Sequence, residues 1–339
     1  MVMQAISAGR IAKRGFGRIP FLPIISTLVG VAIVIGYVID PQITVAVLNS
    51  TLRQSTPLVL GALCGLLGER SGVINIGIEG QMLLSAFIGF LVNVYTGNLL
   101  LAVVAGVGMG GLMGLLLAYM AVTLKMDQII GGTVLNILAF GLTGYFYTAG
   151  LTTQGKLAPI SLGFLAKIPL IGPVLFENPP ITFLTLFLVA LVHYVLFFTR
   201  WGLRTRAVGE HPRAADTVGI NVFFVRYINV ICGGALAGLA GAFLTLEAVG
   251  TFERSMTNGR GFVALAVMIF GKWTPLGAWG AALLFGLATA LQTQLQFAEI
   301  NVPHQFVGML PYVLTVVVLA GFGGRARPPA ADGVPYEKE

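Results

Sequence analysis

Long apolar stretches separated by short polar ones occupy almost the whole chain. A helix needs about 20 mostly apolar residues to cross the hydrocarbon core of a bilayer. The pattern therefore predicts an all-α, polytopic membrane protein with about ten membrane segments, and no fewer than about eight. The predicted segments are 21–39, 43–68, 73–92, 99–121, 128–149, 181–199, 227–248, 261–271, 277–297 and 306–323.

Two of these segments differ from a simple span. The stretch 43–68 is polar in its centre, so that only 57–68, from Pro57 onward, is cleanly apolar. The stretch 261–271 is short and is flanked by charged residues. We expect both to be broken or re-entrant helices; leaving both out would give the lower count and keep the number of crossings even.

The composition supports membrane insertion and excludes several classes of protein. The 339 residues are 56% hydrophobic and 10% charged, whereas soluble domains carry about 25% charged residues. A chain with so few charges cannot cover a water-facing surface, which excludes soluble enzymes and disordered proteins. The net charge of +7 is better explained by loops on the cytoplasmic side of a membrane than by a nucleic-acid partner.

The distribution of basic residues predicts the orientation. If the N-terminus is placed inside and the segments alternate, 15 of the 20 basic residues fall inside. This bias favours cytoplasmic N- and C-termini in a multi-pass membrane protein. The basic residues left outside or in the membrane are Arg53, Lys156, Lys167, Arg254 and Arg260.

The same assignment divides the chain into regions. It predicts a basic cytoplasmic segment at 1–20, a transmembrane domain at 21–323 and a cytoplasmic tail at 324–339. Within the domain, the long Pro- and Gly-rich loop 150–180 is expected outside. The short, highly charged loop 200–226 is expected inside.

The sequence also contains a weak internal repeat and rows of glycine. GALCGLLG at 61–68 and GALAGLAG at 234–241 agree at six of eight positions. Chance similarity between Gly/Ala-rich helices and descent of both halves from one helical unit both explain this agreement. Glycines at four-residue spacing predict close helix–helix approach. They are Gly106, Gly110 and Gly114 in one helix and Gly234 and Gly238 in another.

The segment GERSGVINIGIEG, residues 68–80, places polar groups among glycines at membrane depth. It predicts a break in the helix, because backbone groups freed by a break must lie inside protein or beside water. Asn75 and Glu79 are candidates for a solute pathway. The alternative is structural: Glu69 and Arg70 form an ion pair at the cytoplasmic edge, and Glu79 caps or locks a helix.

Other polar residues inside predicted spans extend the set of pathway candidates. Gln292 and Gln296 lie one helical turn apart and share a face. Their amides would bind a polar solute or would join helices by hydrogen bonds. The candidates for the substrate pathway are Asn75, Glu79, Asn136, Glu247, Gln292 and Gln296.

The charged loop 200–226 contains a predicted short helix. His211-Pro212 is typical of a helix start, since proline suits the first turn, and Gly219 would end the helix. Ala214, Ala215 and Val218 are expected to share one face. The loop is either a solvated connection that obeys the positive-inside rule or carries an amphipathic helix that docks in a groove of a partner.

The chain shows no sign of catalysis. Gly271-Lys272 is followed by Trp273, so a phosphate-binding G-x-x-x-x-G-K-[ST] loop is missing. Motifs of zinc hydrolases and serine hydrolases are missing too. We therefore expect no catalytic residues, metal or cofactor, and a membrane-embedded enzyme is disfavoured.

Several separated motifs resemble ABC importer permeases of the branch that serves ribose-type sugars, branched-chain amino acids and nucleosides. The pattern R-A-x-G-x-x-P-x-A-A-x-x-x-G-I at 206–220 and GGALAGLAGAFL at 233–244 carry this resemblance. Three further motifs resemble the nucleoside and simple-sugar subgroup more narrowly. These are ERSGVINIGIEG at 69–80, KMDQIIGGTVLNILA at 125–139 and GRGFVALAVMIFGKWTPLGAWGAALLFG at 259–286.

The resemblance covers about residues 50–323 and implies a set of partners. Such a permease pairs with a second permease, either a sister chain or a copy of itself. A separate cytoplasmic ATP-binding subunit hydrolyses ATP, and an external solute-binding lipoprotein delivers the solute. His211 departs from the family pattern, which often has Asn there. The implied ATPase-coupling residues are Gly209, Glu210, Pro212, Arg213, Ala214, Ala215, Asp216 and Gly219.

Two functions remain in competition at this point. The first is the pore-forming subunit of an ATP-driven importer, with purine nucleosides as the expected solute and simple sugars next. The second is a stand-alone, ion-coupled secondary transporter, which needs a coupling carboxylate at membrane depth such as Glu79 or Glu247. A docking helix in the loop 200–226 favours the first, because a secondary transporter has no use for one.

Overall fold

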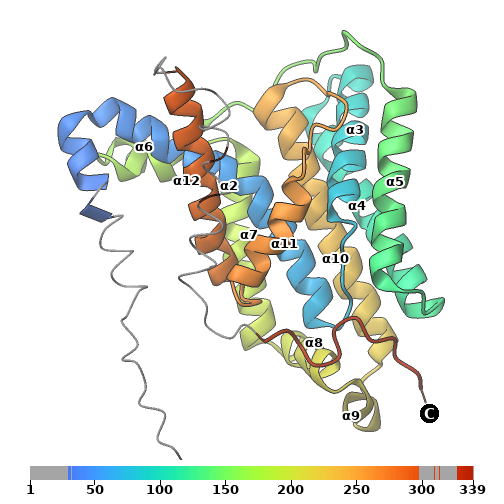
Figure 1. The fold of residues 1–339 in the computed structure, drawn as a ribbon. Helices are drawn as coiled ribbons and strands as arrows, with labels where there is room; N and C mark the ends of the chain where they lie inside the picture. Colours follow the sequence, from blue (N-terminus) through green and yellow to red (C-terminus); the bar gives the residue numbers. More distant parts are fainter. Residues whose placement is uncertain (1–29, 32, 298–308, 310–312, 314–326, 339) are drawn as a thin grey trace, which may run out of the picture.

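The computed structural model describes residues 30–31, 33–297, 309, 313 and 327–338. These residues form a bundle of α-helices (Figure 1). Six of the described helical segments are long and apolar enough to cross a membrane. They are Ile78–Thr96, Leu99–Thr123, Gln128–Phe146, Pro180–Phe198, Val222–Val249 and Pro275–Gln296. The structure is therefore that of a polytopic membrane protein, although its six apolar spans are fewer than the eight to ten segments predicted. The predicted segment 306–323 and much of 21–39 lie outside the described residues.

The helices of the described chain follow in a simple order. They are α2 (Pro41–Arg70), α3 (Ile78–Thr96), α4 (Leu99–Ala118), α5 (Gln128–Phe146), α6 (Ile171–Leu175), α7 (Pro180–Phe198), α8 (Arg200–Glu210), α9 (Pro212–Thr217), α10 (Val222–Ala242), α11 (Arg260–Phe270) and α12 (Pro275–Phe297).

Smaller elements extend or connect these helices. A π-helical turn, Tyr119–Thr123, continues α4, and a π-helical segment, Phe243–Val249, continues α10. The connection between α5 and α7 holds a 3₁₀ turn, Leu165–Lys167, and two short antiparallel strands. These strands are β1 (Ile160–Ser161) and β2 (Glu177–Asn178), with Ile160 opposite Asn178 and Ser161 opposite Glu177.

Local sequence signals explain where several helices begin. The side chain of Asp127 accepts hydrogen bonds from the backbone N–H groups of Ile129 and Ile130 at the start of α5. Asn98 and Asn221 cap α4 and α10 in the same way. Each cap satisfies one or two of the N–H groups that a helix leaves without a partner.

The prediction of a broken helix at 43–68 is wrong. Helix α2 is continuous over 30 residues and contains Pro57 in its interior. Pro57 lacks the N–H that would bond to the carbonyl four residues earlier. In the same turn the hydroxyl groups of Ser55 and Thr56 donate to the carbonyl oxygen of Leu52 at 2.8 and 3.0 Å. These hydroxyl groups do not reach the Arg53 carbonyl that Pro57 leaves free, and proline is allowed here because neighbouring helices enclose the buried Pro57.

The prediction of a short apolar segment near 261–271 is confirmed, because α11 has 11 residues. A helix of that length extends about 16 Å, roughly half of the hydrocarbon core.

Glycine allows α4 and α10 to pack in backbone contact, as the four-residue spacing predicted. A Cβ atom on Gly110 would meet the carbonyl oxygen of Gly234, and one on Gly114 would lie 2.7 Å from the carbonyl oxygen of Val230. The two copies of the internal repeat also lie together, in α2 and α10. A Cβ atom on Gly233 would lie 2.8 Å from the carbonyl oxygen of Cys64.

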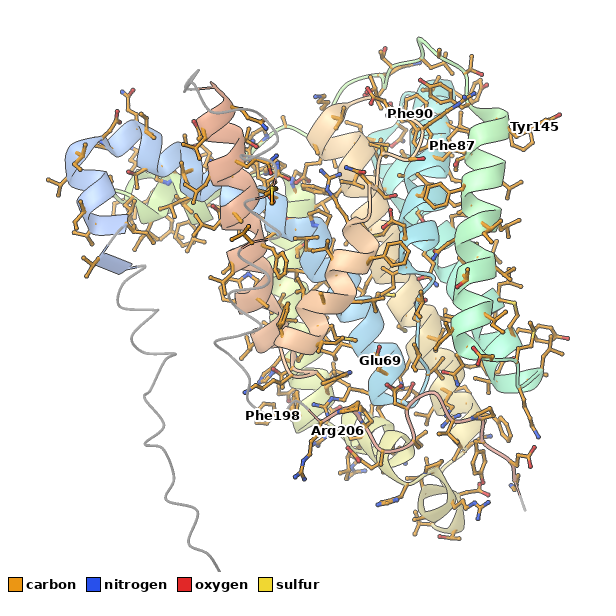
Figure 2. The ribbon with its side chains drawn as sticks, in the orientation of Figure 1. Glu69, Phe87, Phe90, Tyr145, Phe198 and Arg206 are labelled. Atoms are coloured by element: carbon orange, nitrogen blue, oxygen red, sulfur yellow. The ribbon has the colours of Figure 1, made fainter. Side chains whose placement is uncertain are left out.

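The bundle has two distinct ends. Helices α8 and α9 and the segment 327–338 lie together at one end, here called the α9 end (Figure 1). The segment that joins α5 to α7 lies at the opposite end. In Figure 2, Glu69 and Arg206 lie toward the α9 end, whereas Phe87 and Phe90 lie toward the opposite end. One membrane-length helix, α7, therefore separates the predicted outside loop from the predicted inside loop.

Candidate functional site

The α9 end carries the predicted coupling segment. Helix α9 begins at Pro212, as predicted, and ends at Thr217. Gly219 follows with φ of +84°, a conformation that favours glycine and turns the chain toward α10. Gly219, Arg213 and Ala214 are exposed, and Pro212 is half-buried.

One expectation about this helix is wrong. Ala214, Ala215 and Val218 do not share a face, because Ala215 is only 3% exposed and Val218 is 75% exposed. Ala215 packs in a small apolar cluster with Val208 and Tyr336, among others. In so short a helix, the apolar cluster on which it packs decides which face is buried. A helical wheel shows only the positions within the helix and cannot predict this. The exposed face of α9 therefore holds Arg213, Ala214, Thr217 and Val218.

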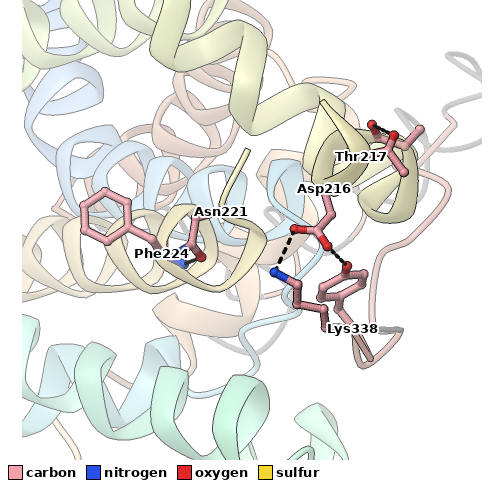
Figure 3. A network of polar contacts seen from close by, with 7 residues as sticks. Asp216, Thr217, Asn221, Phe224 and Lys338 are labelled. Atoms are coloured by element: carbon pink, nitrogen blue, oxygen red, sulfur yellow. Dashed lines mark hydrogen bonds and ion pairs between the residues drawn. The ribbon is translucent and has the colours of Figure 1, made fainter. Parts of the chain in front are cut away.

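The segment 327–338 contacts several of the coupling residues, and no pattern along the chain indicates this. The backbone N–H of Ala331 donates to the carbonyl oxygen of Gly209 at 2.9 Å, and that of Ala330 to a carboxylate oxygen of Glu210 at 3.2 Å. The hydroxyl of Tyr336 donates to Asp216 at 2.9 Å, and Lys338 lies 3.7 Å from the same carboxylate (Figure 3). A surface hollow between α9 and this segment has a volume of about 570 Å³.

Burial changes the titration of one acid in this segment. Asp332 lies close to Glu69 and Arg226, and burial raises the pKa of its carboxyl group to about 6. The attraction of Arg226 lowers this pKa but does not cancel the effect of burial.

The predicted break in the segment 68–80 is confirmed. Helix α2 ends at Arg70, α3 begins at Ile78, and the residues between them are not helical. Side chains replace the missing helical hydrogen bonds. The side chain of Gln128 accepts from the N–H of Ile74 at 2.7 Å, and Asn136 accepts from the N–H of Gly80 at 2.7 Å and donates to the carbonyl of Ile76 at 3.1 Å.

Asn75 also lies inside this network. Its amide nitrogen donates to the side chain of Gln81 at 3.1 Å and to the sulfur of Cys64 at 3.3 Å. Both Asn75 and Asn136 are buried. Their observed contacts hold the non-helical segment in place between α2 and α5.

Glu79 joins the start of α3 to the start of α11. Its two carboxylate oxygens accept hydrogen bonds from the backbone N–H groups of Gly259 and Gly261 at 2.8 and 2.6 Å. The guanidinium of Arg260 interacts with Glu79 electrostatically. A negative charge at a helix N-terminus is favourable, because the free N–H groups point at it.

Glu247 makes the same kind of contact at the start of α7. Its carboxylate accepts from the N–H groups of Ile181 and Thr182 at 2.8 and 3.3 Å, and from the Thr182 hydroxyl at 2.6 Å. Arg53 is its electrostatic partner. Glu79 and Glu247 are thus both buried carboxylates that cap a helix and face an arginine.

The expected ion pair between Glu69 and Arg70 is replaced by three hydrogen bonds to one tryptophan. The indole N–H of Trp273 donates to Glu69 at 2.5 Å, and the guanidinium of Arg70 donates to the carbonyl oxygen of Trp273 at 2.7 and 2.9 Å. These bonds join the end of α2 to the end of α11.

The remaining pathway candidates lie on α12. Gln292 is half-buried and Gln296 is exposed. Helices α2 and α12 are in contact, because a Cβ atom on Gly286 would lie 3.0 Å from the backbone nitrogen of Ser55. The first half of α2 adds half-buried polar side chains. We call these residues together the α2–α12 polar strip: Asn49, Ser50, Arg53, Gln54, Gln292 and Gln296.

Comparison with known proteins gives the family. Residues 47–319 match the family described as branched-chain amino acid transport system / permease component. The guanosine ABC transporter permease protein NupQ of Bacillus subtilis is 39% identical over 88% of this chain and 98% of its own length. The nucleoside ABC transporter permease protein NupC of Lactococcus lactis is 40% identical over 88% of this chain and 97% of its own.

A further relative has a different name. TsgC13 of Haloferax volcanii, an ABC permease provisionally assigned to glucose, is 36% identical over 80% of this chain and 90% of its own. No solved structure gives a significant match. The family match and the long alignments agree with the membrane-length helices and the exposed α9. The chain therefore belongs to the branched-chain amino acid transport system / permease component family, and it is a permease subunit of an ABC transporter.

Proposed function

We propose that this chain forms part of the translocation pathway of an ATP-driven importer of nucleosides. The observation that carries the proposal is the identity of 39–40% with two nucleoside permeases, maintained over 88% of the chain. Because the alignments cover most of each chain, the segments that form the pathway in these relatives are expected to have counterparts in this chain. Simple sugars are the second candidate, because a relative assigned to glucose matches at 36%.

The proposed orientation places the α9 end in the cytoplasm of a prokaryotic cell. Basic residues gather at this end, whereas Lys156, Lys167 and Arg254 lie at the opposite one. The positive-inside rule then puts the segments 1–20 and 324–339 in the cytoplasm and 150–180 outside. The basic residues at or near the α9 end include Arg70, Lys125, Arg200, Arg204, Arg206, Arg213, Lys272, Arg327 and Lys338.

In this orientation α8 and α9 contact a cytoplasmic ATP-binding subunit. The exposed face of α9, with Ala214 and Val218, projects from the bundle and would occupy a groove of that subunit. Gly209, Glu210, Ala215 and Asp216 would hold α9 in position from behind. An external solute-binding lipoprotein and a second permease, sister chain or copy, would complete the importer.

The solute pathway is proposed along the α2–α12 polar strip. Gln292 and Gln296 would donate and accept hydrogen bonds to a polar solute. The buried candidates Asn75, Glu79, Asn136 and Glu247 would shape this pathway from behind, because their polar atoms are bound to other parts of the fold.

Reconstitution tests the proposal. The permease, its genetic neighbours for the ATP-binding subunit and second permease, and the binding protein are placed in liposomes, and uptake of radiolabelled guanosine is measured with and without ATP. We expect ATP-dependent uptake that other nucleosides inhibit and glucose does not. Inhibition by glucose alone would select the sugar. Guanosine uptake by the permease alone under an ion gradient would establish the secondary transporter and overturn the proposal.

A further inference from the structure

We propose that residues 327–338 form a strap that transmits motion from α9 to the non-helical segment between α2 and α3. The inference rests on the proposed role of α9 as the contact with the ATP-binding subunit. It concerns a part of the chain beyond the family match, which ends at residue 319, and beyond the family motifs.

Residues 336–338 of the strap are bound to α9. Asp216 of α9 accepts a hydrogen bond from Tyr336 and lies near Lys338 (Figure 3). The ring of Tyr336 packs in the same apolar cluster as Ala215 and against Phe223. A displacement of α9 therefore displaces the strap at residues 336–338.

Residues 331–334 of the strap are bound to the non-helical segment between α2 and α3. Arg226 of α10 connects the two: it donates to the carbonyl oxygen of Ser71 at 3.1 Å and to that of Val334 at 3.0 Å. Its side chain is only 1% exposed, which is unusual for arginine and shows that the connection is buried.

Direct backbone packing supports this second attachment. Gly72 has φ of +87°, and a Cβ atom there would lie 2.9 Å from the carbonyl oxygen of Ala331. A Cβ atom on Gly333 would lie 2.8 Å from the side chain of Ile74. Ile74 directly precedes Asn75, so the strap touches the segment that holds the buried polar network.

The strap is buried at two separate places. Here Ala331 is 8% exposed and Tyr336 is 7% exposed. Burial at two separate places means that the bundle holds the strap at both of them.

Residues 336–338 of the strap contact α9, residues 330–334 contact the α2–α3 break and the end of α8, and Pro335 lies between these two sets of contacts. This arrangement defines a test. Inserting Gly-Ser-Gly between Val334 and Pro335 lengthens the strap and leaves the residues of both attachments unchanged. The matched control carries the same insertion after Lys338, beyond both attachments. Each variant is purified as the complete importer and reconstituted in liposomes, and ATP hydrolysis and solute uptake are measured on the same sample.

The expected result is a loss of coupling. The inner insertion lowers uptake at least about fivefold, the lower end of typical coupling between sites, while ATP hydrolysis stays within about twofold. The end insertion changes neither rate. Retention of the ATP-binding subunit during purification and an unchanged melting temperature show that the variant is assembled.

Three outcomes would contradict the proposed role of the strap. They are unchanged uptake with the inner insertion, equal losses from both insertions, and a parallel loss of uptake and hydrolysis in an assembled complex. None of these affects the proposed function, provided that the wild-type importer takes up solute with ATP. If the wild-type importer fails to do so, the proposed function fails first.

Discussion

The polar residues of this permease fall into two groups that differ in their partners. Glu79 and Glu247 are buried, and each carboxylate binds two backbone N–H groups and faces an arginine. The residues of the α2–α12 polar strip are half-buried or exposed, and one of them, Arg53, is also the arginine that faces Glu247. The comparison shows that a charged residue at membrane depth need not mark the route of the solute. Its charge can instead be satisfied by hydrogen bonds and electrostatic partners within the fold.

The same contrast holds at the α9 end. Ala215 and Asp216 are bound by the rest of the chain, whereas Ala214 and Val218 face outward. Groups that the fold has already engaged hold the structure together. Side chains that face outward are available to a solute or to a partner subunit. Substitutions on the two sides of this division should therefore fail in different ways.

The largest effect is expected for Glu79→Ala. The substitution leaves one buried and one partly buried N–H group without an acceptor, at about 1–3 kcal/mol for the buried one, and removes the charge that faces Arg260. We expect a large loss of folded protein and a lower melting temperature in detergent. Glu79→Gln keeps one oxygen acceptor and should fall between Glu79→Ala and the wild type.

Glu253→Ala is the matched control, since Glu253 is an exposed glutamate in the connection that leads to α11. It should leave the melting temperature unchanged. If Glu79→Ala folds as well as the control and loses only uptake, Glu79 belongs to the solute pathway and the division drawn above is wrong.

Ala214→Glu should abolish transport without affecting folding. Ala214 is exposed on α9, so the new carboxylate remains in water in the isolated chain but would be buried without a partner in a docked complex. We expect normal insertion, loss of the ATP-binding subunit during co-purification and uptake close to background. Ala149→Glu, an exposed alanine at the opposite end, is the control; a wild-type uptake rate in Ala214→Glu would remove the docking claim.

Gln292→Ala should lower uptake about fivefold, because one neutral hydrogen bond contributes about 1 kcal/mol. Gln296→Ala should have a similar effect, since both side chains share a face. Gln294→Ala is the control within the same helix, because residue 294 points to a different face. The melting temperature should not change in any of the three. Equal effects of all three substitutions on uptake would mean that the strip has no solute-facing side.

Several features of the fold could be predicted because they depend on neighbouring residues. The break after Arg70, the start of α9 at Pro212 and the contact of glycines between α4 and α10 follow from local conformational preferences and helical periodicity. The continuity of α2 through Pro57 could not be predicted, because it depends on the packing of other helices around that buried residue.

The partners of the candidate site residues were harder to predict. The spacing of Glu79 or Glu247 along the chain gives no indication that each would meet the N-terminus of a helix 66 to 182 residues away in sequence. The inward position of Ala215 depends on Tyr336, which lies in the C-terminal segment. Sequence patterns identify which polar residues are unusual, but only tertiary contacts show which of them are already engaged.

The smallest expected effect concerns pH and the strap. Asp332 faces Glu69 of α2 and Arg226 of α10, and its pKa is raised from 3.8 to about 6 in the folded protein. Between these values the folded state binds more protons than the unfolded one, so docking of the strap weakens as pH rises through this window and stays at its lower value above about 6. Asp332→Asn removes the buried charge and with it this dependence.

Hydrogen exchange of the Ala331 amide, which bonds to Gly209, reports on docking of the strap. At pH 7.5 the amide should exchange more slowly in Asp332→Asn than in the wild type, by up to about tenfold, the factor that corresponds to one pKa unit after screening by solvent. At pH 5 the difference should be smaller, because part of the wild-type Asp332 is then protonated. Comparing the two proteins at the same pH cancels the intrinsic pH dependence of exchange. A ratio that is the same at both pH values would show that the Asp332 carboxylate does not oppose docking, and the strap would then join the groups that the fold engages without any electrostatic cost.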